Sequence, residues 1–204
     1  MANSPYLGKN FDQWEAITSD LLKKHPLDQK EIVDVVLQSW RDIFNSKLGP
    51  KAFQIGRDIY PQPQIMAFLL HELIPLELAS RHTKEWRRDQ FGTDKDLVYV
   101  ADEQFSIEIK TSSSANGVFG NRSYAQPTQG DKKSKSGYYL AVNFDGFREA
   151  TTATPKIRKI RFGWLDHSDW KGQAAQSGQA ATPSKEAKKY KLVTLYTAIE
   201  NKYK

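Results

Sequence analysis

The sequence contains no cysteine, so disulfide bonds and thiolate zinc sites are excluded. No apolar run approaches the roughly 18 residues that a membrane-spanning helix needs. Residues 1–5 lack the basic run and apolar segment of a signal peptide. These absences predict a soluble, intracellular protein that does not associate with a membrane.

Histidine is scarce, and its spacing excludes further classes of enzyme. The four histidines are scattered, and none follows His71 and Glu72 at the spacing that a zincin requires. Without clustered histidines, neither a zinc finger nor an HNH-like site is expected. Residues 130–134 lack the spacing of a phosphate-binding P-loop, so we expect no nucleotide cofactor.

Positive charge is concentrated in the last third of the chain. Residues 1–130 hold 15 Lys/Arg against 17 Asp/Glu, whereas residues 131–204 hold 15 against 7, which gives a formal net charge of +6. Basic side chains near phosphates release condensed counterions, so this asymmetry favours binding to a nucleic acid. A solubilising tail could have the same composition.

Amphipathic patterns predict helices before any strand. The first helix begins with the capping pair Asn10 and Gln13, and the second begins with Asp28 and Glu31. A third run, 64–74, is apolar on nearly every side, and the proline that follows should end or kink it. We expect this third helix to be the most buried.

Strands are predicted in the second half of the chain. Residues 112–137 are polar and should be mostly loop, and residues 172–191 are weakly patterned. Arg158, Lys159 and Arg161 alternate with apolar residues, as in a strand with one wet, cationic face. The predicted strands are about 96–101, 105–111, 137–144, 156–164 and 192–196.

This order of elements predicts an α/β (α+β) fold with a central mixed β-sheet flanked by helices. The length fits a single domain over residues 1–204. We divide it into a helical N-terminal part (1–60), a core (61–170) and a C-terminal extension (171–204).

Two neighbouring predicted strands carry the clearest chemical pattern. Residues two apart on a strand project to one face, so Glu108 and Lys110 point together while Ile107 and Ile109 face the core. Asp96, on the preceding strand, can face Glu108. Carboxylate oxygens suit Mg²⁺, which can activate water and neutralise charge on a phosphate.

These residues predict a Mg²⁺-dependent nuclease. Asp96 and Glu108 would bind the metal, with the backbone carbonyl of Ile109 as a candidate third ligand. Lys110 would orient the attacking water and help to neutralise the phosphate. The alternative is a surface ion pair of Lys110 with Glu108 or Asp96, which would contribute little to stability.

Asp96 with the run 108–110, preceded by a helix that carries Glu72, resembles the PD-(D/E)XK nuclease superfamily. Lys95 replaces the proline that usually precedes the first aspartate, which leaves Asp94 as a rival for that role. Most of the chain also resembles the ScaI-type restriction endonucleases. The segments that carry this likeness are 64–77, 94–100, 108–113, 119–126, 133–144 and 159–166.

The resemblance implies a restriction-endonuclease-like domain with its nuclease core in 61–170, Mg²⁺ as cofactor, and a homodimer in the bacterial cytoplasm. It implies hydrolysis of both strands of double-stranded DNA at a short palindrome, AGTACT, to blunt ends with 5′-phosphate and 3′-hydroxyl. In that superfamily a helix before the sheet can supply a further acid. Glu72 fits this role by position and Glu77 is a rival, while pairing of Glu72 with Arg81 or Arg57 is an equal alternative.

The segment after Lys110 combines readers of base edges with phosphate contacts. Asn and Gln can pair with adenine and Arg with guanine, whereas Lys and Ser more often contact phosphates. A solvated loop could have a similar composition, but the position beside the metal site favours DNA. Arg158, Lys159 and Arg161 would extend this surface. The predicted DNA-binding residues are Ser112, Ser113, Ser114, Asn116, Asn121, Arg122, Ser123, Gln126, Gln129, Lys132, Lys133 and Lys135.

Two other functions stay open on the sequence. A repair or junction-resolving nuclease of the same superfamily would share the metal site and recognise DNA structure instead of sequence. A non-catalytic DNA-binding protein would need only the basic third of the chain. For symmetric cleavage of two antiparallel strands we expect a two-fold dimer, with its partner surface on the first two helices.

Overall fold

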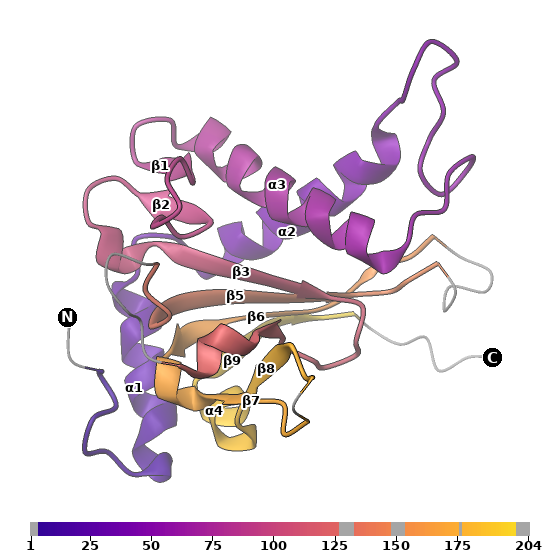
Figure 1. Cartoon of the computed structure of the whole chain (residues 1–204). Helices are drawn as coiled ribbons and strands as arrows, with labels where there is room; N and C mark the ends of the chain where they lie inside the picture. Colours follow the sequence, from indigo (N-terminus) through magenta and orange to yellow (C-terminus); the bar gives the residue numbers. More distant parts are fainter. Residues whose placement is uncertain (1–3, 127–132, 148–153, 176, 199–204) are drawn as a thin grey trace.

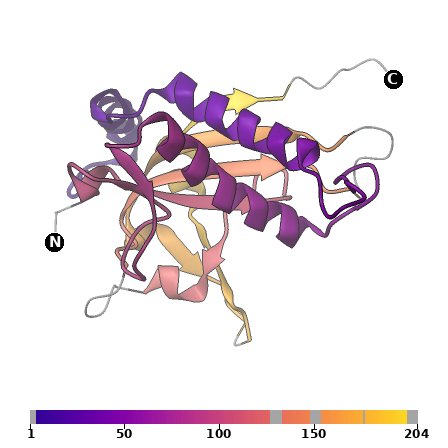
Figure 2. The same cartoon turned by 90° about the horizontal axis from the view of Figure 1, so that it is seen from above.

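The computed structural model describes residues 4–126, 133–147, 154–175 and 177–198. A mixed six-stranded sheet has α2 (Gln29–Asn45) and α3 (Pro63–Arg81) on one face, and a three-stranded sheet with α4 (Lys185–Tyr190) on the other (Figure 1). Figure 2, seen from above, shows α2 and α3 crossing the strands of the large sheet. This arrangement confirms the predicted α/β (α+β) class.

The large sheet contains the five predicted strands and one short strand that the sequence does not predict, β1. The third and fourth strands in spatial order, β3 and β5, pair in parallel, whereas the other neighbours are antiparallel. The spatial order is β1 (Trp86–Arg88), β2 (Leu97–Tyr99), β3 (Ile107–Ser112), β5 (Gly137–Phe144), β6 (Ile157–Leu165) and β9 (Leu192–Thr197).

The helices begin at their predicted capping residues. The first helix, α1 (Phe11–Lys24), follows Asn10, which forms a capping box with Gln13. The second, α2, follows Asp28, whose side chain accepts two backbone N–H bonds. Pro75 does not end α3, which continues to residue 81. Because proline has no N–H, the carbonyl of His71 loses its usual helical hydrogen bond at that turn.

α3 is exposed along one side, so the expectation that it is the most buried helix is wrong. Leu70 and Ile74 are buried against α2 and the large sheet, but Ile65, Phe68 and Leu76 are 52%, 60% and 44% exposed. A helix on the outer layer has one inward face, so an all-round apolar sequence leaves apolar side chains in solvent. Neither α3 nor any other described helix is long and apolar enough to cross a membrane.

Strand β5 lies at the centre of the molecule, and all its residues are buried. Leu140 and Val142 belong to the large hydrophobic cluster under α2 and α3, whereas Tyr139 and Ala141 belong to a smaller cluster under the small sheet. A strand that is covered on both faces forms a nearly continuous apolar run. This explains why the sequence predicts its bounds so well.

The small sheet was not predicted, because its strands lie in segments that read as loop or as weakly patterned. Its order is β4 (Gly120–Asn121), β8 (Ala180–Pro183) and β7 (Trp170–Gly172). A 3₁₀ turn, η2 (Arg122–Ala125), follows β4 directly. These pieces place part of the polar segment 112–137 next to β3 (Figure 1).

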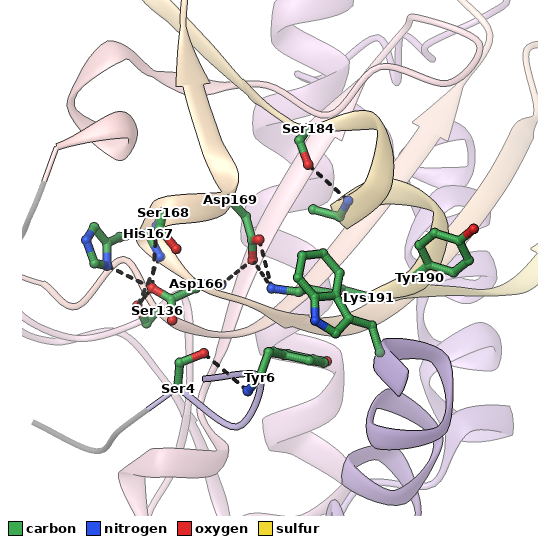
Figure 3. Close-up of polar contacts among 12 residues, drawn as sticks. Ser4, Tyr6, Ser136, Asp166, His167, Ser168, Asp169, Ser184, Tyr190 and Lys191 are labelled. Atoms are coloured by element: carbon green, nitrogen blue, oxygen red, sulfur yellow. Dashed lines mark hydrogen bonds and ion pairs between the residues drawn. The ribbon is translucent and has the colours of Figure 1, made fainter. Parts of the chain in front are cut away.

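A buried ion pair joins the small sheet to the N-terminal segment. Lys191, between α4 and β9, donates to both carboxylate oxygens of Asp169 at 2.8 and 2.9 Å (Figure 3). The ammonium also lies 4.1 Å from the ring centre of Tyr6 and 3.8 Å from that of Trp14. Lys191 and Asp169 are 2% and 6% exposed. The pair therefore connects α1, the turn η3 (His167–Asp169) and the edge of the large sheet.

Candidate active site

Three charged side chains from two neighbouring segments meet on one face of the large sheet. In β3, Ile107 and Ile109 enter the large hydrophobic cluster, and the alternate residues Glu108 and Lys110 lie on the side of the small sheet. Asp96 immediately precedes β2, which is paired with β3. The structure thus brings Asp96, Glu108 and Lys110 together.

Asp96 is fixed by three groups. Its Oδ2 accepts a hydrogen bond from the backbone N–H of Ile109 at 2.7 Å and lies 3.1 Å from His71 Nε2. Its Oδ1 lies 2.7 Å from Lys133 Nζ. Burial would raise the pKa of Asp96, but the hydrogen bond from His71 and the nearby positive charges lower it below its usual value. The carboxylate is therefore ionised at neutral pH.

Glu108 is 2% exposed and is surrounded by cations. Its Oε1 accepts a hydrogen bond from Lys110 Nζ at 2.7 Å, and its Oε2 lies 2.7 Å from Lys133 Nζ. Burial and the charge of Asp96 raise the pKa of Glu108, but the lysines lower it further, so the net shift is downward. Two ionised carboxylates therefore lie side by side, which is stable only where positive charge is close.

Tyr124, in η2, joins this group from the small sheet. Its hydroxyl donates to Glu108 Oε1 and accepts from Lys110 Nζ at 3.0 Å. The Lys110 ammonium also lies 4.6 Å from the centre of the Tyr124 ring. Burial and the charge of Glu108 raise the pKa of Tyr124, so its hydroxyl keeps its proton as a donor. Tyr124 thus fixes both the carboxylate and the ammonium.

The donor set fits a divalent cation. One ammonium, that of Lys133, already bridges Asp96 and Glu108, so a single positive group can span both carboxylates. Glu108 Oε2 is buried and accepts no hydrogen bond of good geometry from the described residues. The described ranges contain no group of three His, Cys, Asp or Glu suited to a metal. However, Mg²⁺ keeps several waters, so two carboxylates can suffice.

A cavity of about 590 Å³ lies beside this site, between β3 and the small sheet. Glu108 and Lys110 form one wall, and Asn121, Gln173 and Gln179 form the opposite, exposed side. The catalytic candidates are therefore reachable from a surface that carries amide side chains. The other lining residues are Phe119, Gly120, Tyr124 and Ala180.

Three carboxylates considered from the sequence have other partners. Glu72 Oε2 lies 2.9 Å from a guanidinium nitrogen of Arg88, and it pairs with neither of the arginines considered from the sequence. Glu77 is hydrogen-bonded within α3. Asp94 closes the turn between β1 and β2 through Arg87 at 2.6 Å, and this bond lowers the pKa of Asp94 to about 2. Asp96, and not its rival Asp94, therefore faces Glu108.

The predicted DNA-binding residues are only partly gathered at the cavity. Asn121 lines it, and Lys133 reaches the two carboxylates. Arg122 donates to the carbonyl of Gly178 at 3.0 Å, and Lys135 to that of Gln126 at 3.1 Å. Gln129 and Lys132 lie outside the described residues. The remaining predicted residues are exposed or half-buried, namely Ser112, Ser113, Ser114, Asn116 and Ser123.

The expected cationic face of β6 is smaller than predicted. Arg161 is 6% exposed, and it donates to Asn143 Oδ1 at 2.7 Å on the neighbouring strand. Its burial lowers the pKa of its guanidinium. Arg158 contacts Asp145. Because this part of the strand is covered by the segment around Asn116, Arg161 serves packing and cannot extend a DNA-facing surface.

Sequence reasoning missed four residues of this region. His71 was considered only for a zinc site, although its neighbour Glu72 was placed near the metal. Since Glu72 and His71 are adjacent on a helix, they point in different directions, and the packing of α3 decides which one meets Asp96. Tyr124, Gln173 and Gln179 carry no motif, because their position depends on the small sheet.

Comparison with known proteins identifies the family of the chain. The model of the ScaI restriction endonuclease family matches residues 4–196. The chain is also 46% identical, over 197 residues, to the type II restriction enzyme ScaI of Streptomyces caespitosus; this match covers 96% of the chain and 86% of that enzyme. The resemblance inferred from the sequence is thereby confirmed. The chain belongs to the ScaI restriction endonuclease family.

Proposed function

We propose that the protein is a type II restriction endonuclease that uses Mg²⁺ to hydrolyse both strands of double-stranded DNA. The observation that carries this proposal is the meeting of Asp96, Glu108 and Lys110 beside a cavity open to a polar surface. Membership of the ScaI family supports the same activity. A surface ion pair would not explain why two carboxylates are buried side by side.

Asp96 and Glu108 would hold the metal, with the Ile109 carbonyl as a third ligand. When bound, Mg²⁺ would make a water nucleophilic and neutralise charge on the phosphate. The hydrogen bond from the Ile109 amide fixes Asp96, and Tyr124 fixes Glu108. Lys110 would hold the attacking water and one phosphate oxygen, since its ammonium lies at the cavity wall.

DNA would approach from the side of the small sheet. Asn121, Gln173 and Gln179 present amides there, and such groups can pair with adenine edges. The other predicted residues of segment 112–135 would contact phosphates and neighbouring bases. From the likeness to ScaI-type enzymes we infer AGTACT as the target, cut to blunt ends with 5′-phosphate and 3′-hydroxyl. Glu72 would stay a neighbour of the site, bonded to Arg88.

A homodimer in the bacterial cytoplasm completes the proposal. Two antiparallel strands cut at symmetric positions require two active sites related by a two-fold axis. The exposed apolar side chains Ile65, Phe68 and Leu76 on α3 offer a partner surface, in addition to the first two helices. Sedimentation equilibrium of the purified protein should give twice the mass of the chain.

The test combines DNA cleavage in Mg²⁺ with DNA binding in Ca²⁺. Wild-type protein with Mg²⁺ should cut a plasmid at discrete positions, and run-off sequencing of the ends gives the target. Asp96→Ala and Lys110→Ala should each lower the cleavage rate by roughly 10³-fold, as expected when charge stabilisation at a reacting centre is lost. Binding to the same DNA in Ca²⁺ should stay nearly intact.

Lys84→Ala and Glu85→Ala, at exposed positions between α3 and β1, serve as controls of matched charge and should cut normally. Nicks that depend on DNA structure instead of sequence would support a repair nuclease. Binding without any cleavage by the wild-type protein would contradict the enzymatic proposal.

A further inference from the structure

Among the described residues, Lys133 is the one predicted DNA contact that lies between the two proposed metal ligands. Its Nζ is 2.7 Å from Asp96 Oδ1 and 2.7 Å from Glu108 Oε2. We propose that Lys133 is a positioning residue that holds these carboxylates together until a divalent cation takes its place, and that the displaced ammonium then binds a DNA phosphate. This inference rests on the proposed nuclease function.

The ammonium and the metal need the same oxygens. A Mg²⁺ ion binds carboxylate oxygens at roughly 2.0–2.1 Å, whereas the Lys133 nitrogen already occupies the space 2.7 Å from both. A cation bound there would therefore lie within van der Waals distance of Nζ. Two positive groups that close repel each other strongly in a site with little water. Lys133 and the metal must consequently exclude each other.

The charges of the site also support the exchange of Lys133 for a metal ion. Asp96 and Glu108 carry two negative charges, and the ammonium groups of Lys110 and Lys133 balance them. Without Lys133, two carboxylates would lie side by side with less positive charge between them, so their mutual repulsion would be offset only when another cation binds. Lys133 therefore takes the place of that cation before the metal arrives.

Release of Lys133 needs a movement of its side chain and no rearrangement of its backbone. The next residues are anchored, since Lys95 Nζ donates to the Ser134 carbonyl at 3.0 Å and Lys135 donates to the Gln126 carbonyl at 3.1 Å. The Lys133 side chain is 25% exposed, so its flexible stem has a route to solvent. A lysine ammonium is a mobile point charge that suits a phosphate.

This arrangement links metal binding to DNA binding. A phosphate that captures Lys133 removes the competitor of the metal, and a metal that displaces Lys133 frees a cation for the phosphate. By thermodynamic linkage, each ligand must raise the affinity for the other by the same factor. The free protein would bind metal weakly, and the DNA complex would bind it tightly.

The first experiment measures Mn²⁺ binding to the full chain without DNA, by electron paramagnetic resonance of free Mn²⁺. Lys133→Met keeps the length of the side chain and removes its charge, so we expect its Mn²⁺ affinity to rise about tenfold. Lys133→Arg should keep the weak binding of the wild type. Lys171→Met, at an exposed position on β7, is the control and should not change the affinity. Equal or weaker binding by a folded Lys133→Met protein would overturn the proposal.

A second measurement needs no variant. Acylation of lysines in the wild-type protein, read by peptide mass spectrometry, should label Lys133 several-fold more in the presence of Mn²⁺, while Lys171 stays constant. Unchanged labelling of Lys133 would reject its displacement. Both measurements omit DNA, so tighter Mn²⁺ binding in a protein that cuts no DNA would defeat the nuclease proposal alone. Normal cleavage with unchanged Mn²⁺ affinity would defeat only the role of Lys133.

Discussion

The two faces of the large sheet are stabilised in different ways. Under α2 and α3, 23 buried apolar residues of the described part of the chain form one cluster, and the buried His25 lies among its aromatic rings. On the other face, the cluster beneath the small sheet has eight buried apolar residues among those described, and the buried ion pair of Lys191 with Asp169 lies beside it. The first face is stabilised by its buried apolar surface. The second face buries less apolar surface and adds a buried ion pair.

The difference has a functional reason. The proposed active site must be open to DNA, a large polar substrate, so the face that would carry it cannot be sealed by a thick apolar layer. Glu108 and Lys110 lie on that thinner side, and Tyr124 reaches them from the small sheet. We therefore expect the helical face to set stability through burial and the other face to depend on a few named polar contacts.

The largest effect is expected when the ion pair of Lys191 with Asp169 is broken. Lys191→Met keeps the packing against Tyr6 and Trp14 but leaves the carboxylate of Asp169 buried without its partner. Removing one member of a buried pair costs about 3–5 kcal/mol. Urea denaturation should show this loss in the free energy of unfolding.

Asp169→Asn combined with Lys191→Met provides the matched control, because it removes both charges. The double variant should recover a large part of the lost stability. If Lys191→Met lost less than about 1 kcal/mol, within the range of an exposed pair, the small sheet would not depend on this bond.

A smaller effect, the change of stability with pH, tests the face of the large sheet that α2 and α3 cover. His25 Nδ1 accepts from the amide of Leu27 at 3.2 Å and Nε2 lies 3.0 Å from the Phe105 carbonyl, an arrangement that suits the neutral ring. Burial lowers the pKa of His25 from 6.5 to about 4. The unfolded chain therefore takes up the proton first as the pH falls. This contribution to stability is complete above pH 6.5 and is lost between about 6.5 and 4.

By linkage, His25 should account for about 2 kcal/mol of lost stability between pH 8 and pH 5. His25→Gln should be less stable at pH 8 but should lose about that much less over the same range. The free energy of unfolding of both proteins is measured by urea denaturation at each pH. If the two curves against pH were parallel, the buried His25 ring would not cause the loss of stability in acid.

The smallest effect tests the contact between the large sheet and the turn η2 beside the small sheet. Tyr124→Phe keeps the ring beside Lys110 and removes the hydroxyl that donates to Glu108. We expect the single-turnover cleavage rate to fall about tenfold, or about 1.4 kcal/mol in activation free energy, with DNA affinity in Ca²⁺ unchanged. Tyr60→Phe, at an exposed tyrosine, is the control. A rate within twofold of the wild type would show that Tyr124 does not position the site.

Much of the large sheet and the centre of the site follow from the sequence, because local patterns determine them. The capping residues Asn10 and Asp28 locate two helices, and the alternation of Ile109 with Glu108 and Lys110 assigns the faces of β3. Such period-two patterns depend on the strand itself and not on its neighbours.

The rest depends on tertiary packing that no local pattern encodes. The strand Gly120–Asn121 is too short for a pattern, and its partner β8 lies some sixty residues later along the chain. The contact of His71 with Asp96 requires α3 to lie against β1 and β3 at one angle. Lys133 reads as a phosphate contact because its charge is visible in the sequence, whereas its position between two carboxylates is not.

The parallel pairing of β3 and β5 has a consequence for the chain that joins them. Parallel neighbours cannot be joined by a tight turn, so the chain after Ser112 must travel back along the sheet before Gly137. Tyr124 and Lys133 both belong to that passage. The passage therefore ties the proposed DNA contacts to the carboxylates of the site, so that a change in its path would alter both together.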